Sequence, residues 1–154
     1  MNYGRALAAG VAGGTAMTIG MALLRASGMP ANPEMMLGTM FFPQGGVAWV
    51  AGFTMHLIVS ALIALIYAWG FEHVTHRAGW AIGMLFALIH IPIGGIVMGM
   101  MPVMHPMIPE MMPPPGAFMS GMGMMGVMAF VAEHLVYGAI VGAVYEPVRR
   151  PIAA

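Results

Sequence analysis

The stretch His90-Ile-Pro-Ile-Gly-Gly-Ile-Val-Met-Gly-Met-Met-Pro-Val-Met-His105 joins the end of a long apolar segment to a loop rich in methionine and proline. Between Met98 and Met128, the chain holds 12 of its 21 methionines, one histidine, one carboxylate and no lysine or arginine. Thioether and imidazole groups are therefore concentrated where charge is excluded. This pattern is typical either of a site for a soft metal ion or of flexible apolar packing at a membrane surface.

The composition around this stretch is that of an integral membrane protein. The chain has 154 residues, of which 60% are hydrophobic and 6% charged, and its mean hydropathy is +0.88. Soluble domains carry about 25% charged residues. Because a membrane-spanning helix needs about 20 mostly apolar residues, we expect about four spans in a single membrane domain that covers residues 1–154 and contacts the lipid bilayer.

Charge and cysteine content exclude several classes of function. The formal net charge is zero and the five basic residues are scattered, so the sequence has no nucleic-acid-binding patch. The lack of cysteine excludes disulfides, thiolate-held iron–sulfur clusters and a cysteine nucleophile. Hydrolase signatures, phosphate-binding loops and paired catalytic carboxylates are not evident either, so we expect a protein that is not an enzyme.

Hydropathy predicts an all-α bundle of four transmembrane helices. The predicted spans are residues 6–24, 47–71, 78–101 and 121–145. Prolines and glycines interrupt residues 26–46 and 102–120, which we interpret as loops rich in methionine and proline. The first of these loops is predicted to lie along the membrane interface.

The arginines predict the orientation, because positive residues accumulate on the cytoplasmic side of a membrane protein. One side of the four-span arrangement carries Arg5, Arg77, Arg149 and Arg150, whereas the other carries Arg25 alone. The N- and C-termini are therefore predicted to be cytoplasmic. Both long loops would then lie on the outer face of a bacterial inner membrane.

Three histidines fall inside the predicted spans. At about 1.5 Å of helix per residue, His56, His90 and His134 lie near the middle of a hydrocarbon core about 30 Å thick. Glu133 lies at a similar depth, where an isolated ionised carboxylate is costly, so we expect it to be neutral or paired. Ser60 and Tyr137 are candidate polar partners of these groups.

The buried histidines have two interpretations. Imidazole is a common ligand of zinc, copper and haem iron, and ionisable groups within membranes usually serve a function, as metal ligands or proton relays. Alternatively, each histidine makes a separate hydrogen bond between helices. A b-type haem held by two of the three histidines is the less favoured cofactor, because close-packing glycine faces leave little room for a porphyrin.

The loop after the third span adds a second group of candidate ligands. Its spacing is Met101-x-x-Met104-x-x-Met107 with His105 adjacent. Thioethers favour copper(I), which requires no charged ligand, so the loop is predicted to gather copper. An adaptable apolar lid without any bound metal is the alternative, because methionine is abundant throughout the chain.

Several motifs resemble those of a family of small, uncharacterised bacterial multi-pass membrane proteins. They are the stretch from Arg5 to Thr18, the helix from His56 to Tyr67, Met104-His105-Pro106, and the stretch from His134 to Tyr145. The resemblance implies four transmembrane helices and no particular activity.

The favoured function is therefore a non-enzymatic membrane protein that binds or handles a soft metal ion, copper above all. The alternative is an accessory subunit of a larger membrane complex, in which the histidines serve packing or proton transfer. A small-residue face such as Gly138-x-x-x-Gly142 would then dock a helix of the partner. Either protein could form a homo-oligomer.

Overall fold

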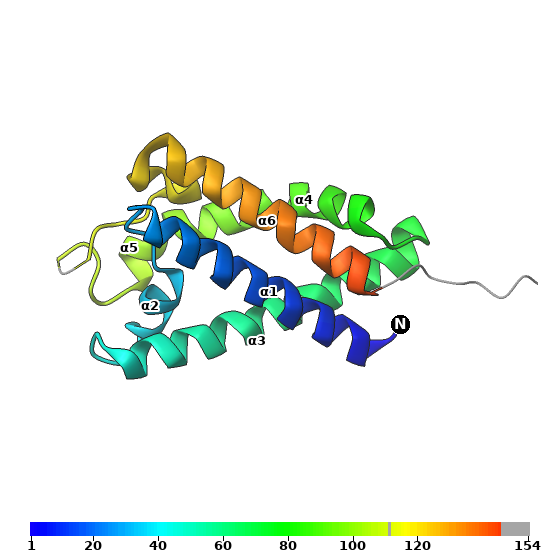
Figure 1. Cartoon of the computed structure of the whole chain (residues 1–154), viewed down its shortest axis with the longest axis horizontal. Helices are drawn as coiled ribbons and strands as arrows, with labels where there is room; N and C mark the ends of the chain where they lie inside the picture. The colour runs from blue at the N-terminus through cyan, green and yellow to red at the C-terminus, as the bar shows by residue number, and fades with distance from the viewer. Residues whose placement is uncertain (111, 146–154) are drawn as a thin grey trace, which may run out of the picture.

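The computed structural model describes residues 1–110 and 112–145, and all its regular elements are helical (Figure 1). Four helices are long and apolar enough to cross a membrane. They are α1 (Tyr3–Ala26), α3 (Gly46–Gly70), α4 (Trp80–Gly99) and α6 (Gly123–Tyr145). The π-helical turn η1 (Phe71–Thr75) extends α3, and the 3-10 segment η2 (Ala117–Met122) precedes α6. The predicted four-span, all-α architecture is confirmed.

The two ends of the bundle differ. One end carries the short helices α2 (Pro33–Gly38) and α5 (Met101–Met104), whereas the N-terminus lies at the other end (Figure 1). Arg25 lies at the last turn of α1, which is the α2 end, and Arg5 lies in the first turn of the same helix. Arg149 and Arg150, on which the predicted orientation partly depends, lie outside the described residues.

Small residues bring α1 against α3. A Cβ atom on Gly10 would come 2.5 Å from the backbone oxygen of Ser60, and one on Gly14 would lie 2.6 Å from the Ser60 hydroxyl. Any larger side chain at either position would push the helices apart, since real Cβ atoms do not approach other atoms so closely. The Gly10-x-x-x-Gly14 spacing therefore sets the distance between these two spans.

Glycines also bring α4 against α6, and here one expectation was wrong. Gly138 and Gly142 are buried, and Cβ atoms on them would collide with the backbone oxygens of Gly83 and Gly79 respectively. The face with the Gly138-x-x-x-Gly142 spacing therefore packs inside the protein and is not available to a partner helix. Its small residues serve the α4–α6 contact instead.

The helices form two pairs, α1 with α3 and α4 with α6, which meet mainly along α1 and α6. Although α3 and α4 follow one another in the chain, their backbones do not approach closely, and the two helices meet through aromatic side chains. Aromatic residues fill the interior near the N-terminal end, where the rings of Tyr67, Phe71 and Phe86 contact one another. Toward the α2 end, α3 diverges from α1, and α2 lies between them (Figure 1).

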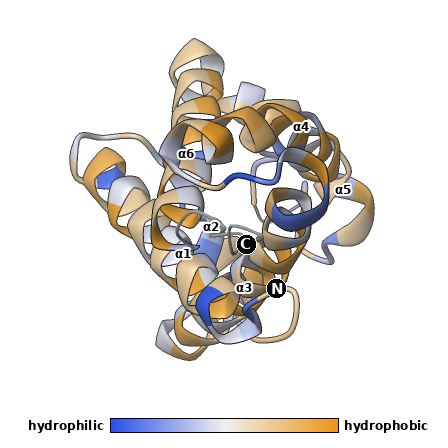
Figure 2. Ribbon diagram, turned by 90° about the vertical axis from the view of Figure 1, so that its right-hand side faces the viewer, coloured by the Kyte–Doolittle hydropathy of each residue, from blue (hydrophilic) through white to orange (hydrophobic). Residues whose placement is uncertain are grey.

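The outer surface of the bundle is apolar, as lipid contact requires. Many aliphatic and aromatic side chains are exposed on the four long helices, such as Ile66 on α3 and Ile89 on α4. Figure 2 shows hydrophobic colouring around the helices, with few hydrophilic segments. In a soluble protein this surface would cause aggregation, whereas in a bilayer it is the normal boundary.

The short helix α2 corrects the expectation that residues 26–46 form only a loop. Asn32 caps its start, since the Asn32 side-chain oxygen accepts a hydrogen bond from the Met35 amide, and Pro33 occupies the first helical position. This is the usual chemistry of a helix N-terminus. The α2 helix packs closely on α3, because Gly52 of α3 lies directly against the Glu34 backbone.

Candidate functional site

A cavity of about 280 Å³ lies inside the bundle, toward the α2 end. All four long helices and α2 contribute to its lining. Its ionisable lining residues are Glu34, His56, His90, Glu133 and His134, and its methionines are Met17, Met21, Met36, Met98, Met101 and Met119. All three histidines predicted to be buried thus face one space, together with Ser60 and Tyr137.

The histidines of α4 and α6 lie in direct contact. The rings of His90 and His134 are arranged edge to face, with 4.9 Å between their centroids. Two aromatic rings flank His90: Tyr67 at 6.1 Å and Tyr137 at 5.7 Å between centroids. The Tyr137 hydroxyl in turn donates a hydrogen bond to the backbone oxygen of Ser60, which links α6 to α3.

The hydrogen bonds of His134 leave one ring nitrogen available. Its Nδ1 lies 2.7 Å from the carbonyl oxygen of Phe130. Since a carbonyl only accepts, Nδ1 carries the hydrogen and Nε2 has a free lone pair. Nε2 is directed toward Gly94 of α4, where a Cβ atom would lie 3.1 Å from it. A histidine whose second nitrogen is fixed by a carbonyl is the usual form of a metal ligand.

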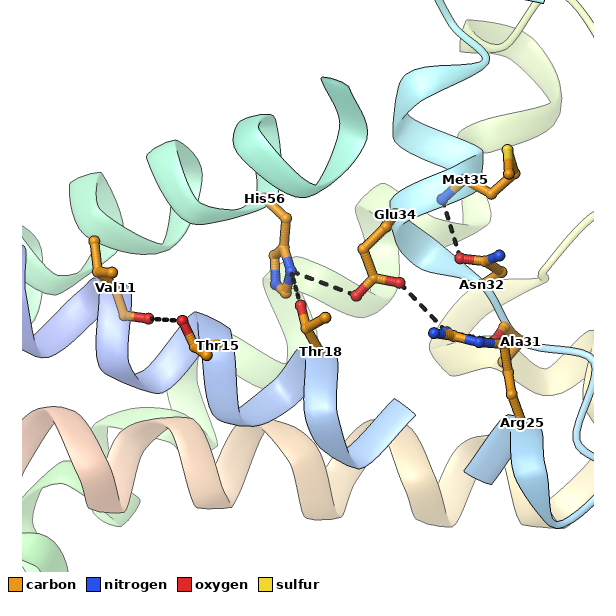
Figure 3. A network of polar contacts seen from close by, with 9 residues as sticks. All are labelled: Val11, Thr15, Thr18, Arg25, Ala31, Asn32, Glu34, Met35 and His56. Carbon is orange, nitrogen blue, oxygen red and sulfur yellow. Dashed lines mark hydrogen bonds and ion pairs between the residues drawn. The ribbon is translucent and has the colours of Figure 1, made fainter. Parts of the chain in front are cut away.

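The third histidine of the spans, His56, is half-buried and belongs to a separate polar group at the α2 end of the cavity (Figure 3). Its Nδ1 lies 3.2 Å from the Thr18 hydroxyl of α1 and 3.9 Å from the Glu34 Oε1 atom of α2. The other Glu34 oxygen, Oε2, lies 3.4 Å from the Arg25 guanidinium. Four residues from three helices therefore form one charged network beside the cavity.

Glu133 lies on α6 and faces α1. Its carboxylate lies so close to Gly20 that a Cβ atom at that position would overlap it. It makes no hydrogen bond or ion pair with another described residue. The expectation that Glu133 is either paired or neutral therefore stays a prediction.

The loop residues predicted to gather copper occupy different surroundings. Met101 is buried and lines the cavity, whereas Met104 is 47% exposed and Met107 is half-buried. His105 is buried, with Nε2 2.9 Å from the Met36 carbonyl, and its Nδ1 accepts a hydrogen bond from the Met107 amide. The Nε2 atom of His105 thus joins the loop to α2, whereas Nδ1 makes a bond within the loop. Copper binding by Met104, His105 and Met107 stays a prediction.

The geometry limits which groups the cavity can hold. Among the described residues, no three histidine or carboxylate side chains are close enough to bind one metal ion as they stand. The His90 and His134 rings touch each other, so no porphyrin fits between them as between two axial ligands. Two imidazole nitrogens on one ion, at about 2.0–2.1 Å each, lie up to about 4 Å apart, which the contacting rings allow.

Sequence interpretation missed Glu34 and its partner Arg25. Glu34 was hidden in a segment with three prolines that reads as a loop, although Asn32-Pro33-Glu34 is a recognisable helix start. Arg25 was interpreted only as an orientation signal at the end of α1. Their pairing depends on the fold of α2 against α3, which no local pattern indicates.

The fold and the cavity define a multi-pass membrane protein with an apolar interior that contains histidine, carboxylate and thioether groups. Comparison with protein-family models, with curated proteins and with solved structures finds no match for this chain. Function must therefore be inferred from the chemistry of the cavity.

Proposed function

We propose that this protein binds copper(I) inside the membrane, with His90 and His134 as nitrogen ligands. The observation that carries the proposal is the contact between these two rings at the wall of a cavity lined by methionines. Imidazole and thioether groups are ligands that copper(I) accepts in proteins, and both are neutral. Because neutral ligands leave the charge of the ion uncompensated, an ion with a single charge suits this apolar interior better than a divalent ion.

The thioethers complete the coordination in this proposal. Met98 of α4 and Met101 of α5 line the cavity. Met21 of α1 and Met119 of η2 line it as well. Methionine side chains are flexible and unbranched, so one or two can move toward an ion held by the imidazoles. Zinc is a poorer candidate, since structural zinc sites use four ligands, commonly cysteine and histidine.

We place this protein in the inner membrane of a bacterium, with cytoplasmic termini and with the α2 end outside. Arg5 lies in the first turn of α1 and Arg77 follows η1, so both lie at the end opposite α2. The single opposing arginine, Arg25, is paired with Glu34. Among the described residues, two of the three arginines thus lie at the N-terminal end, which favours its cytoplasmic assignment.

Metal analysis of the purified protein tests the proposal. We expect stoichiometric copper after mild detergent extraction from cells grown with added copper. A variant carrying both His90→Ala and His134→Ala should lose this copper, whereas His73→Ala, which changes an exposed histidine outside the cavity, should keep it.

Two other results would favour the alternatives. Metal-free protein that co-purifies with fixed partners would indicate an accessory subunit whose histidines serve packing or proton transfer. A haem absorption band would indicate a b-type haem bound in an arrangement other than the one described here.

A further inference from the structure

A fully buried carboxylate lies at the α2 end of the cavity, and one of its oxygens has no partner. Glu34 is 0% exposed and lines the cavity. Its Oε2 atom pairs with Arg25, whereas Oε1 has no hydrogen-bond partner among the described residues. A buried charged oxygen is normally hydrogen-bonded or bound to a cation. The Oε1 atom is therefore a buried acceptor that can bind a cation.

The atoms around Oε1 suit a small cation. Figure 3 shows the Glu34 carboxylate directed at the His56 ring, whose Nδ1 lies 3.9 Å away. This distance is too long for a hydrogen bond. A metal ion bonded to a nitrogen and an oxygen at about 2.0–2.2 Å each holds the two atoms up to about 4 Å apart, the longest separation being that of a linear arrangement. The Thr18 hydroxyl, 3.2 Å from the same nitrogen, adds another oxygen.

The charge balance explains why Arg25 lies beside this group. Glu34 carries one negative charge, which the Arg25 guanidinium neutralises at 3.4 Å. The Arg25 side chain is 24% exposed, and its second contact is the Ala31 carbonyl at 3.2 Å. It can therefore turn toward the surface without leaving the polar region. An incoming cation and the guanidinium would compete for one carboxylate.

We propose that Glu34 and His56 form a second cation site, which captures copper(I) before it reaches His90 and His134. Arg25 neutralises Glu34 while this outer site is empty and moves aside when the ion binds. The proposal rests on the proposed function, since copper(I) is the ligand of both sites. Met36, on the same short helix as Glu34, lines the cavity and supplies a thioether that can bind the ion during its transfer.

The test follows the transfer of copper(I) from a coloured chelator to the full-length protein in detergent, without oxygen and with a reductant. Glu34→Gln keeps the shape of the side chain and removes its charge. We expect it to slow transfer at least about tenfold and to leave the final amount of bound copper unchanged. The control Glu110→Gln, at an exposed carboxylate of the loop after α5, should change neither quantity.

A second variant at the same site keeps the test independent of any folding defect in Glu34→Gln. His56→Gln should slow transfer to a similar extent, and Arg25→Gln should speed it, because the competing cation is removed. Transfer at the wild-type rate in both Glu34→Gln and His56→Gln would overturn the outer site.

The doubly substituted His90→Ala, His134→Ala protein separates this proposal from the proposed function. If this double variant loses copper and Glu34→Gln slows transfer, both proposals are supported. If the double variant loses copper and Glu34→Gln transfers copper at the wild-type rate, the outer site is overturned and the proposed function stands. If the double variant keeps copper that adding Glu34→Gln then removes, the outer site stands and the proposed function is overturned. If the wild type binds no copper, both proposals fail.

Discussion

The ring of His90 stands edge-on to the ring of His134, with 4.9 Å between centroids, although the two residues belong to different helices. This contact exists because α4 and α6 approach closely where Gly83 meets Gly138, one turn after His134. The glycines therefore set the distance between the two candidate ligands. Any change that widens the α4–α6 interface should also separate the imidazoles.

Gly138→Ala should destabilise the protein, because its new Cβ atom would collide with the Gly83 carbonyl oxygen, which is backbone and cannot move aside alone. We expect the free energy of unfolding to fall by about 1–3 kcal/mol. Thermal unfolding in detergent measures the effect. Gly46→Ala is the matched control, since nothing lies within 4 Å of a Cβ there, and an equal loss in both variants would contradict the interpretation.

Arg25→Gln should destabilise the protein because it leaves the buried Glu34 carboxylate without a counter-charge. Breaking a buried ion pair typically costs about 3–5 kcal/mol, whereas removing both charges costs much less. Combining Arg25→Gln with Glu34→Gln should therefore restore much of the lost thermal stability. The exposed Arg77→Gln serves as the control. A double variant that is less stable than Arg25→Gln alone would refute the pairing.

His105→Ala should release the loop after α5 from α2. The substitution removes hydrogen bonds to the Met36 carbonyl and from the Met107 amide, and an unpaired buried group costs about 1–3 kcal/mol. Hydrogen exchange at the Met107 amide should accelerate in this variant and stay unchanged in His73→Ala. Slow exchange in both variants would mean that His105 does not hold the loop.

The orientation can be measured by thiol labelling, because the chain contains no cysteine. Val103→Cys lies at the α2 end and Val74→Cys at the opposite end, and both parent side chains are well exposed, at 89% and 61%. A membrane-impermeant reagent should label Val103→Cys from outside, and Val74→Cys only after the membrane is opened. Labelling of both from the same side would disprove the four-span topology.

Hydropathy was sufficient to predict the four spans and the inward direction of the buried histidines. The observed ends of α1 and α3, for example, lie within a few residues of those predicted, because long apolar runs have few alternatives in a membrane. The inward direction of His56 follows from the cost of exposing an imidazole to lipid. These conclusions need only the properties of single segments.

The cavity and the outer polar group could not be predicted in the same way. The long helices are apolar on all sides, so no periodic pattern indicates which face of α3 or α4 meets a neighbour. The spacing of Met101, Met104 and Met107 suggests a shared face, yet α5 ends at Met104 and the chain then turns. Glu34 reaches the cavity only because α2 folds back against α3.

The separation of α3 from α4 leaves the cavity bordered by exposed aliphatic side chains, such as Val59 on α3 and Ile93 on α4. At the N-terminal end, the covalent link through η1 joins these two helices. At the other end, the His105 hydrogen bonds join the chain after α4 to the α2 helix packed on α3. The cavity is thus bordered at the side of the bundle by apolar residues of α3 and α4. In a bilayer this side faces the acyl chains, so we expect the surrounding lipid or detergent to influence what the cavity binds.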